Sequence, residues 1–216
     1  MIQKRHINIL IACEESQAEC KAFRDLGFNA FSCDIQKCRP RIGVPEWHIC
    51  GDVTTLLNGR TSFQTQDGKL HTVLKWHLII AHPPCTYICK VSSVHMMRNG
   101  QLNLDRLQKQ KEAVNFFRKC LAAKADFVAV ENPLPQARAG LPKPSFFIQP
   151  YWFGVKYSKK TLYWVKGLPP IMPTIINPDY KEFVRNSRGK YRSRTFPEVA
   201  EAIAKQWGDF LLSQIK

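Results

Sequence analysis

The junction between a short apolar run and a pair of prolines constrains this chain most. Leu78-Ile79-Ile80 is typical of a buried strand, and Pro83-Pro84 ends it, because neither proline can donate a backbone hydrogen bond to a neighbouring strand. Ligands of open α/β sheets bind beyond the carboxyl ends of the strands. Cys85 follows the prolines at once and is therefore a candidate for chemistry. A rigid turn followed by a small buried thiol is the structural alternative.

The rest of the chain alternates between apolar runs and amphipathic segments, which predicts an α/β fold. Ser16, with Glu19 three residues later, is a candidate capping box for a helix that ends at Gly27. Residues 88–103 are polar and are expected to form a mobile loop over the site. Strands are expected at 7–12, 28–33, 47–50, 76–81 and 127–130, a strand pair at 151–155 and 161–165, and further helices at 104–124 and from Pro197.

Acidic residues follow several of these predicted strands. Asp34 comes about 20 residues after the turn that ends the first strand, which suits an acid that binds the two hydroxyls of a ribose. Asp52 follows the third predicted strand, and Glu131-Asn132-Pro133 follows the strand at 127–130. The chain contains no GxGxxG sequence, so a nicotinamide dinucleotide is disfavoured. A nucleoside-containing cofactor fits better, although any β-α-β unit with a surface Asp would look the same.

The positive charge of the chain is concentrated in two segments. The net charge is +15; residues 90–124 carry eight basic and two acidic side chains, and residues 155–194 carry ten and two. Such unevenness indicates a polyanion-binding face, and the aromatic residues of the second segment favour nucleic acid over a membrane surface. A basic surface without a partner is the alternative.

The eight cysteines do not indicate a disulfide framework. No secretory signal is evident, and the chain is long enough to build an apolar core, so reduced thiols in the cytoplasm are expected. The cysteine spacings include no CxxC pair, and no metal is expected. No apolar run approaches 18 residues, so no membrane span is expected. The oligomeric state cannot be read from the sequence.

In this order, the motifs resemble those of DNA cytosine carbon-5 methyltransferases, and most closely the short phage-encoded members. Pro84-Cys85 is similar to the family's Pro-Cys nucleophile motif, and Glu131-Asn132 is similar to the Glu-Asn that grips the target cytosine. Phe153-Gly154-Val155, with Lys159 and Thr161, resembles the family's eighth motif, and residues 195–204 resemble its last.

The resemblance implies a single Rossmann-like S-adenosylmethionine-dependent methyltransferase domain over residues 1–216, with a mostly parallel sheet and helices on both faces. It implies DNA as substrate and the bacterial host cytoplasm as compartment. Cys85, Glu131 and Lys159 would be catalytic. Cofactor contacts would come from Ala12, Cys13, Glu14, Ser16, Gln17, Asp34, Ile35, Asp52, Val53, His82, Pro83 and Thr195, and substrate contacts from Pro84, Thr86, Asn132, Lys160, Arg192 and Arg194.

The chain also departs from the family pattern. Its first loop has Cys13-Glu14-Glu15 in place of the family's glycines, and His82 precedes the proline pair. Residues 166–194 are a basic, irregular insert that would be a vestige of the target-recognition region, so sequence preference should be weak and binding salt-dependent. Three alternatives stay open: an amino-group methyltransferase, an inactive nucleic-acid-binding protein on the same fold, and an enzyme acting on RNA, single strands or nucleotides.

Overall fold

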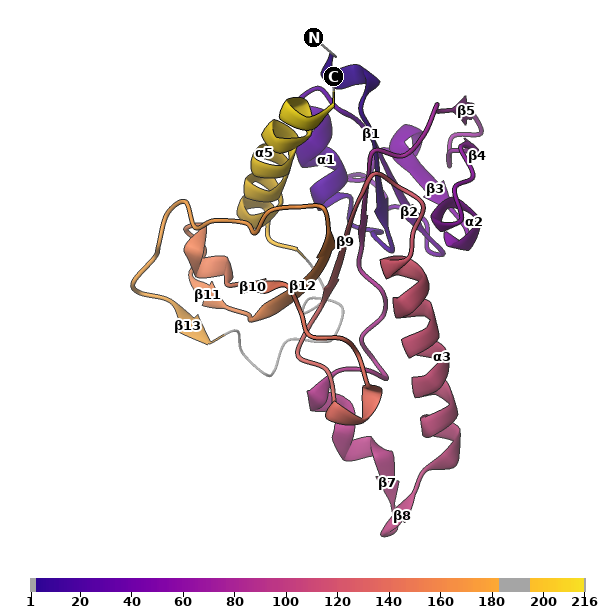
Figure 1. Ribbon diagram of the computed structural model, residues 1–216, viewed down its shortest axis with the longest axis vertical. Coiled ribbons are helices and arrows are strands. Elements are labelled where there is room, and N and C mark those ends of the chain that lie inside the picture. The colour runs from indigo at the N-terminus through magenta and orange to yellow at the C-terminus, as the bar shows by residue number, and fades with distance from the viewer. Residues whose placement is uncertain (1–2, 183–194, 216) are drawn as a thin grey trace.

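The computed structural model describes residues 3–182 and 195–215 and is built around a seven-stranded sheet (Figure 1). Its strand order is β10-β12-β9-β6-β1-β2-β3. Within this sheet, neighbouring strands are parallel across β9, β6, β1, β2 and β3, whereas β12 is antiparallel to both β9 and β10. Their bounds are β1 Asn8–Ala12, β2 Asn29–Asp34, β3 His48–Cys50, β6 Leu78–Ala81, β9 Phe127–Asn132, β10 Phe146–Ile148 and β12 Thr161–Lys166.

Helices cover both faces of the sheet, so the expected Rossmann-like α/β fold is confirmed (Figure 1). Ile9 and Ile11 of β1 face α1 (Ala18–Asp25) and α5 (Pro197–Gln214). Leu10 and Ala12 face the other core, which contains residues of α2 (Thr54–Leu57) and α3 (Leu104–Leu121). This alternation follows from the two-residue period of a strand, and it decides to which side each strand-end side chain points.

Close packing on the α1 and α5 face depends on one glycine. Gly208 lies in α5, and a Cβ atom built there would be 2.7 Å from the ring of Phe28. Trp207, the residue before it, is fully buried in the same core. The absence of a side chain at position 208 therefore lets α5 approach the segment that leads into β2.

The capping box predicted at Ser16 and Glu19 is wrong. Helix α1 begins at Ala18, and its N-cap residue is Gln17, whose side chain makes no cap hydrogen bond. The Glu14 carboxylate takes that role from the end of β1, accepting hydrogen bonds from the backbone N–H groups of Glu19 (2.7 Å) and Cys20 (3.3 Å). The sequence signal failed because the capping acid comes from outside the local motif.

The strand predicted at residues 151–155 is also wrong. Pro150–Trp152 forms a 3₁₀ turn, and β12 pairs instead with β9 and with β10, which lies in the region expected to be a loop. Pro150 removes a backbone donor, and the aromatic side chains after it pack on one another rather than along a strand. Tyr151 stacks on Tyr180 at a centroid distance of 3.9 Å, and Trp152 lies against Phe147.

Three small two-stranded sheets complete the described fold. The polar segment between residues 58 and 72 contains the antiparallel pair β4 and β5, with Gly68 in the turn between them. Residues 88–103 are not structureless: Lys90–Met96 form a 3₁₀ helix, and β7 and β8 form a short hairpin beside the start of α3 (Figure 1). We call residues 90–103 the arm. No helix among the described residues is both long and apolar enough to cross a membrane. The bounds are β4 Ser62–Gln64, β5 Leu70–Thr72, β7 Met97–Arg98, β8 Gln101–Leu102, β11 Tyr157–Ser158 and β13 Lys181–Glu182.

Candidate active site

The strand order reverses at β1, because β2 and β3 follow on one side of it and β6 and β9 on the other. Ligands of doubly wound sheets bind beyond the carboxyl ends of the strands at such a switch point. β1 and β6 end together there: Ala12 pairs with Ala81, and the backbone N–H of His82 donates to the Ala12 carbonyl at 2.9 Å. His82 is thus the first residue beyond the switch point.

His82 lies between two carboxylates. Its Nδ1 is 3.2 Å from Glu131 Oε2, and its Nε2 is 3.3 Å from Glu19 Oε2. Glu19 comes from α1 and is fully buried, whereas Glu131 comes from β9 and is partly exposed. The register that pairs Ala81 with Val130 brings residues 82 and 131 side by side. We call Glu19, His82 and Glu131 the carboxylate–histidine row.

Electrostatics favour an ionised row. Burial lowers the pKa of His82, but the charges of Glu19 and Glu131 and the hydrogen bonds to them outweigh burial, and the net pKa lies well above its usual value. Burial raises the pKa of Glu131, but the hydrogen bond and charge of His82, followed by the charge of Lys159, lower it by more. The net pKa therefore lies below its usual value. Glu131 is therefore held as a carboxylate beside a protonated imidazole.

A third acid, Glu14, adjoins the row, and its pKa is raised rather than lowered. Burial and the nearby Glu19 charge raise the pKa of Glu14 to about 7, against the opposing effect of His82 and the two backbone hydrogen bonds. Glu14 is buried and caps α1, so its side chain is committed to the helix rather than to a ligand.

Two non-glycine residues of the first loop are in the left-handed conformation, which is more usual for glycine. Cys13 has φ 62° and Gln17 has φ 58°, a region that costs L-residues on the order of 1 kcal/mol. The backbone N–H groups of Cys13 and Glu14 both donate to the Cys33 carbonyl, at 2.7 and 3.2 Å. The Gln17 side chain bonds Ser32 and Val44. The loop is thus fixed across the ends of β1 and β2 without glycines.

The other predicted cofactor residues lie at the ends of β2 and β3. Asp34 ends β2 with a partly exposed side chain, and its Oδ1 accepts from the Gln36 N–H at 2.8 Å. Ile35 beside it is 79% exposed, which is unusual for so large an apolar side chain. Asp52 is exposed, whereas Ala12 and Val53 are buried in the core. Ser16 lies partly exposed in the first loop.

Cys85 lies in a single helical turn just past the prolines. The N–H of Cys89 donates to the Cys85 carbonyl at 2.9 Å, which places the two thiols on the same side of the turn. A hydrogen bond with the Cys89 thiol, burial, and the charges of Cys89 and Glu131 all raise the pKa of Cys85. The Glu131 carboxylate is thus close enough to act on the thiol electrostatically, although Cys85 is still partly exposed.

A hydrogen bond between Asn132 and Pro83 connects the end of β9 to the residues just before this turn. Asn132 is 1% exposed, and its Nδ2 donates to the Pro83 carbonyl at 2.8 Å. The sequence interpretation made Asn132 a substrate contact and Pro83 a cofactor contact, but both side chains are buried. Asn132 instead ties the end of β9 to the proline turn, while Pro84 and Thr86 are exposed beside Cys85.

A shallow pocket brings three predicted residues together on the other side of Glu131. Glu131, Lys159 and Thr195 line it with Thr161 and Tyr163. The backbone N–H of Lys159 is fixed by Gln149 Oε1 at 2.9 Å. Lys160 points elsewhere, with its ammonium 4.4 Å from the centroid of the Phe147 ring. Arg192 and Arg194 lie outside the described residues, as does part of the predicted recognition insert.

Sequence reasoning missed two residues that the structure brings to the site. Glu19 was assigned only to a helix cap, and a buried acid on an amphipathic helix carries no sequence signal of its partner across the sheet. Gln136 was unremarked within a proline-rich loop, yet its side chain bonds the carbonyls of Tyr87 and Cys89 and the Ser92 hydroxyl. It links the Cys85 turn to the segment that follows β9.

The fold and the row together define a Rossmann-like α/β protein with a buried acid–histidine–acid arrangement at its switch point. No family model and no curated protein matches the chain. Among solved structures, the chain is similar to a crystal structure of a proposed DNA modification methyltransferase encoded within a prophage of E. coli. The match has 14% identity and a TM-score of 0.44, and covers 80% of this chain and 52% of the other. This chain therefore spans about half the length of that protein.

Proposed function

We propose that this protein is an S-adenosylmethionine-dependent DNA methyltransferase that modifies carbon 5 of cytosine. The observation that carries the proposal is the position of Cys85 shortly past the end of β6 and of Glu131 near the end of the adjacent parallel strand β9, near enough for the Glu131 charge to raise the Cys85 pKa. Carbon-5 chemistry requires such a thiol and carboxylate to face one base that has been flipped out of its stack.

The reaction begins when Cys85 releases its proton to solvent and the thiolate sulfur bonds to carbon 6 of the ring. The C5–C6 π electrons shift toward carbon 5 and the N3 edge, which makes carbon 5 enamine-like. Glu131 contacts the N3 edge, where negative charge develops. After methylation, loss of the proton from carbon 5 and of the sulfur from carbon 6 restores the aromatic ring. Each step needs a proton to be accepted or supplied beside the base.

The carboxylate–histidine row could supply one of these protons, through Glu131. His82 is protonated and donates to Glu131 Oε2, so a proton is available to Glu131 when charge accumulates at N3. Glu19 holds the opposite edge of the imidazole and keeps it charged. Lys159 lies in the same pocket as Glu131 and adds positive charge on its other side. We propose that His82 acts through Glu131 rather than as a cofactor contact.

The residues at the ends of β1, β2 and β3 fit S-adenosylmethionine, which supplies an electrophilic methyl group when bound. Asp34 offers a partly exposed carboxylate for the ribose hydroxyls, and the exposed Ile35 offers an apolar surface for the adenine ring. Asp52 is exposed at the next strand end, with Oδ1 already bonded to Thr54. The backbone of Cys13 is in the left-handed conformation directly after β1, and the first loop crosses the end of β2 there.

An amino-group methyltransferase is the second candidate. It needs no thiolate at position 85, and the hydrogen bond with the Cys89 thiol and burial raise the pKa of Cys85. Under this alternative the Pro83-Pro84 turn would position the amino group and Cys85 would be structural.

Methyl transfer from labelled S-adenosylmethionine to unmodified DNA, followed by nucleoside mass spectrometry, tests the proposal. The expected product is 5-methylcytosine, lost in Cys85→Ser and retained in Cys50→Ser, a matched change at an exposed thiol. An amino-methylated base that persists in Cys85→Ser would select the second candidate. No product, together with no heat of S-adenosylmethionine binding in calorimetry, would leave a nucleic-acid-binding protein without activity.

A further inference from the structure

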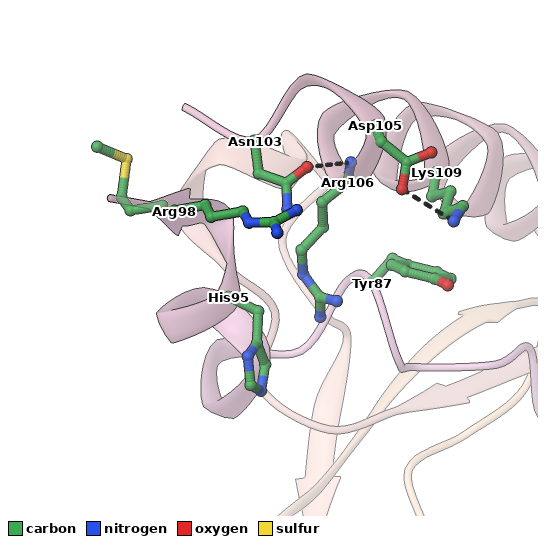
Figure 2. A pocket seen from close by; sticks show the side chains of 8 residues that line it. Tyr87, His95, Arg98, Asn103, Asp105, Arg106 and Lys109 are labelled. Carbon is green, nitrogen blue, oxygen red and sulfur yellow. Dashed lines mark hydrogen bonds and ion pairs between the residues drawn. The ribbon is translucent and has the colours of Figure 1, made fainter. Parts of the chain in front are cut away.

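A pocket of about 390 Å³ lies between the arm and the first turns of α3, away from the carboxylate–histidine row (Figure 2). The arm contributes His95 and Arg98, and α3 contributes Arg106 and Lys109. Tyr87, two residues after Cys85, closes the side nearest the candidate nucleophile. No step proposed above uses this pocket.

Arg106 is fixed at the centre of the pocket. Its Nη2 donates to the Thr86 carbonyl at 3.0 Å and lies 3.4 Å from the Ser92 carbonyl. Its guanidinium lies 5.0 Å from the centroid of the Tyr87 ring, and Figure 2 shows it between Tyr87 and His95. The Nε–H is buried without a hydrogen-bond partner among the described residues. A buried donor left unpaired is costly, so this N–H group favours a ligand that supplies an acceptor.

Two further cations are presented on the rim. Arg98 reaches across the pocket from the β7–β8 hairpin toward Asn103 (Figure 2). Lys109 is paired with Asp105 at 2.9 Å, but both side chains are substantially exposed, so the pair is weak and Lys109 can exchange it for a ligand. With Asp105 as its acidic residue, the pocket keeps an excess of positive charge.

We propose that this pocket binds a backbone phosphate of DNA and thereby anchors the strand whose base lies at Cys85. The identity of that base rests on the proposed function, whereas the phosphate contact does not. Arginine and lysine side chains are the usual phosphate partners, and such contacts set the register of a protein on DNA. Cys85 and Tyr87 are two residues apart, at most about 7.6 Å between Cα atoms, so the anchored phosphate belongs to a nucleotide close to the target.

This site lies in the first of the two basic segments, residues 90–124, that were expected to form a polyanion-binding face. Target recognition itself was expected from residues 166–194, after β12. The residues that line the pocket instead come from the part of the sequence after β6 and before β9, which includes Cys85, the arm and α3. A phosphate bound there would be held by the same Arg106 that fixes the Thr86 carbonyl, so strand binding and placement of the Cys85 turn would be coupled.

The test measures equilibrium binding of a fluorescent DNA duplex at several salt concentrations and needs no methyl transfer. Arg98→Gln and Lys109→Gln remove rim charges without touching the Cys85 turn. Lys111→Gln is the matched control, because it removes the same charge from an exposed position on the opposite side of α3. We expect each pocket variant to weaken binding several-fold and to reduce the slope of log affinity against log salt by about 1. The control should change neither by as much.

Equal loss in Lys111→Gln and the pocket variants, or no loss in the pocket variants, would overturn the proposal. A thermal shift by inorganic phosphate that needs Arg98, with unchanged DNA binding, would assign the pocket to a free anion and would also overturn it. If the pocket variants behave as expected but no methylated base forms, the phosphate site stands and the proposed function fails. If methylation occurs with unaltered binding in the pocket variants, the reverse holds.

Discussion

His82 and Glu131 face each other across adjacent parallel strands, with His82 Nδ1 3.2 Å from Glu131 Oε2 and Glu19 on the far edge of the imidazole. Each strand places its residue one position beyond the register pair Ala81 and Val130. A buried histidine between two carboxylates is stable only while all three are present, because the removal of one member leaves uncompensated charge in the interior.

We therefore expect His82→Gln to lower the free energy of unfolding by about 3–5 kcal/mol, since a glutamine can donate to one carboxylate but leaves the other unpaired. Urea denaturation would measure the change. The double variant His82→Gln/Glu19→Gln should recover part of the loss. Lys205→Ala, which breaks an exposed pair with Asp209, should cost less than about 1 kcal/mol and serves as control. A similar small loss in His82→Gln would contradict a charged row.

Glu14 should make stability fall as pH rises. Its pKa is raised from 4.5 to about 7 in the folded protein, so between these values the folded state holds a proton that the unfolded state has released, and folding weakens with increasing pH. Glu14→Gln should remove this decline, with a gain relative to wild type on the order of 3 kcal/mol at most between pH 4 and 8. Unfolding curves for both proteins across that range give the difference. A constant difference at every pH would show that Glu14 is ionised throughout.

Glu131 should slow the reaction of Cys85 with alkylating reagents. The Glu131 charge is among the causes that raise the Cys85 pKa, so Glu131→Gln should increase the thiolate fraction and the rate of alkylation by iodoacetamide near pH 8. Mass spectrometry of the fragmented peptide distinguishes Cys85 from Cys89. Cys50, which is exposed at the end of β3, should react at the same rate in both proteins. An unchanged or slower rate at Cys85 would show that the Glu131 charge does not raise the Cys85 pKa.

Gly208→Ala should destabilise the protein despite the higher helix propensity of alanine. The added Cβ would meet two ring carbons of Phe28 at 2.7 and 2.9 Å, both too short for a relaxed contact. Overpacking of this kind costs about 1–3 kcal/mol, against a propensity gain of about 1 kcal/mol. Thermal or urea unfolding would show the loss, and Gly51→Ala, where no atom lies within 4 Å, is the comparison. Equal effects of the two changes would show that Phe28 yields freely.

The central strands were predictable because their apolar runs are short and end in distinctive turns. The segments over β1, β2, β6 and β9 and the long helices α3 and α5 follow from the spacing of apolar residues and, for α5, from Pro197 in its first turn. The 151–155 segment shows the limit: its aromatic side chains have high strand propensity, yet they stack with Tyr180 and Phe147 instead.

The candidate site was predictable in its strand-end residues and not in their connections. Cys85, Asp34 and Glu131 follow strands, and a sheet edge gathers such positions without further information. The partners of His82 depend on which strands are neighbours and on where α1 lies, and neither is written near His82 in the sequence. The bond from Asn132 to the Pro83 carbonyl was not predictable for the same reason, because it crosses between two strands.

The arm and the carboxylate–histidine row are attached to the molecule in different ways. The row is set by the register of the most buried strands, where a slip of one residue would turn Glu131 toward the opposite core. The arm is a surface insertion between β6 and α3. Its hairpin can therefore be lengthened, shortened or exchanged between related chains while the buried pair keeps its alignment. Changes in the arm and changes in the row are thereby structurally independent of each other in this fold.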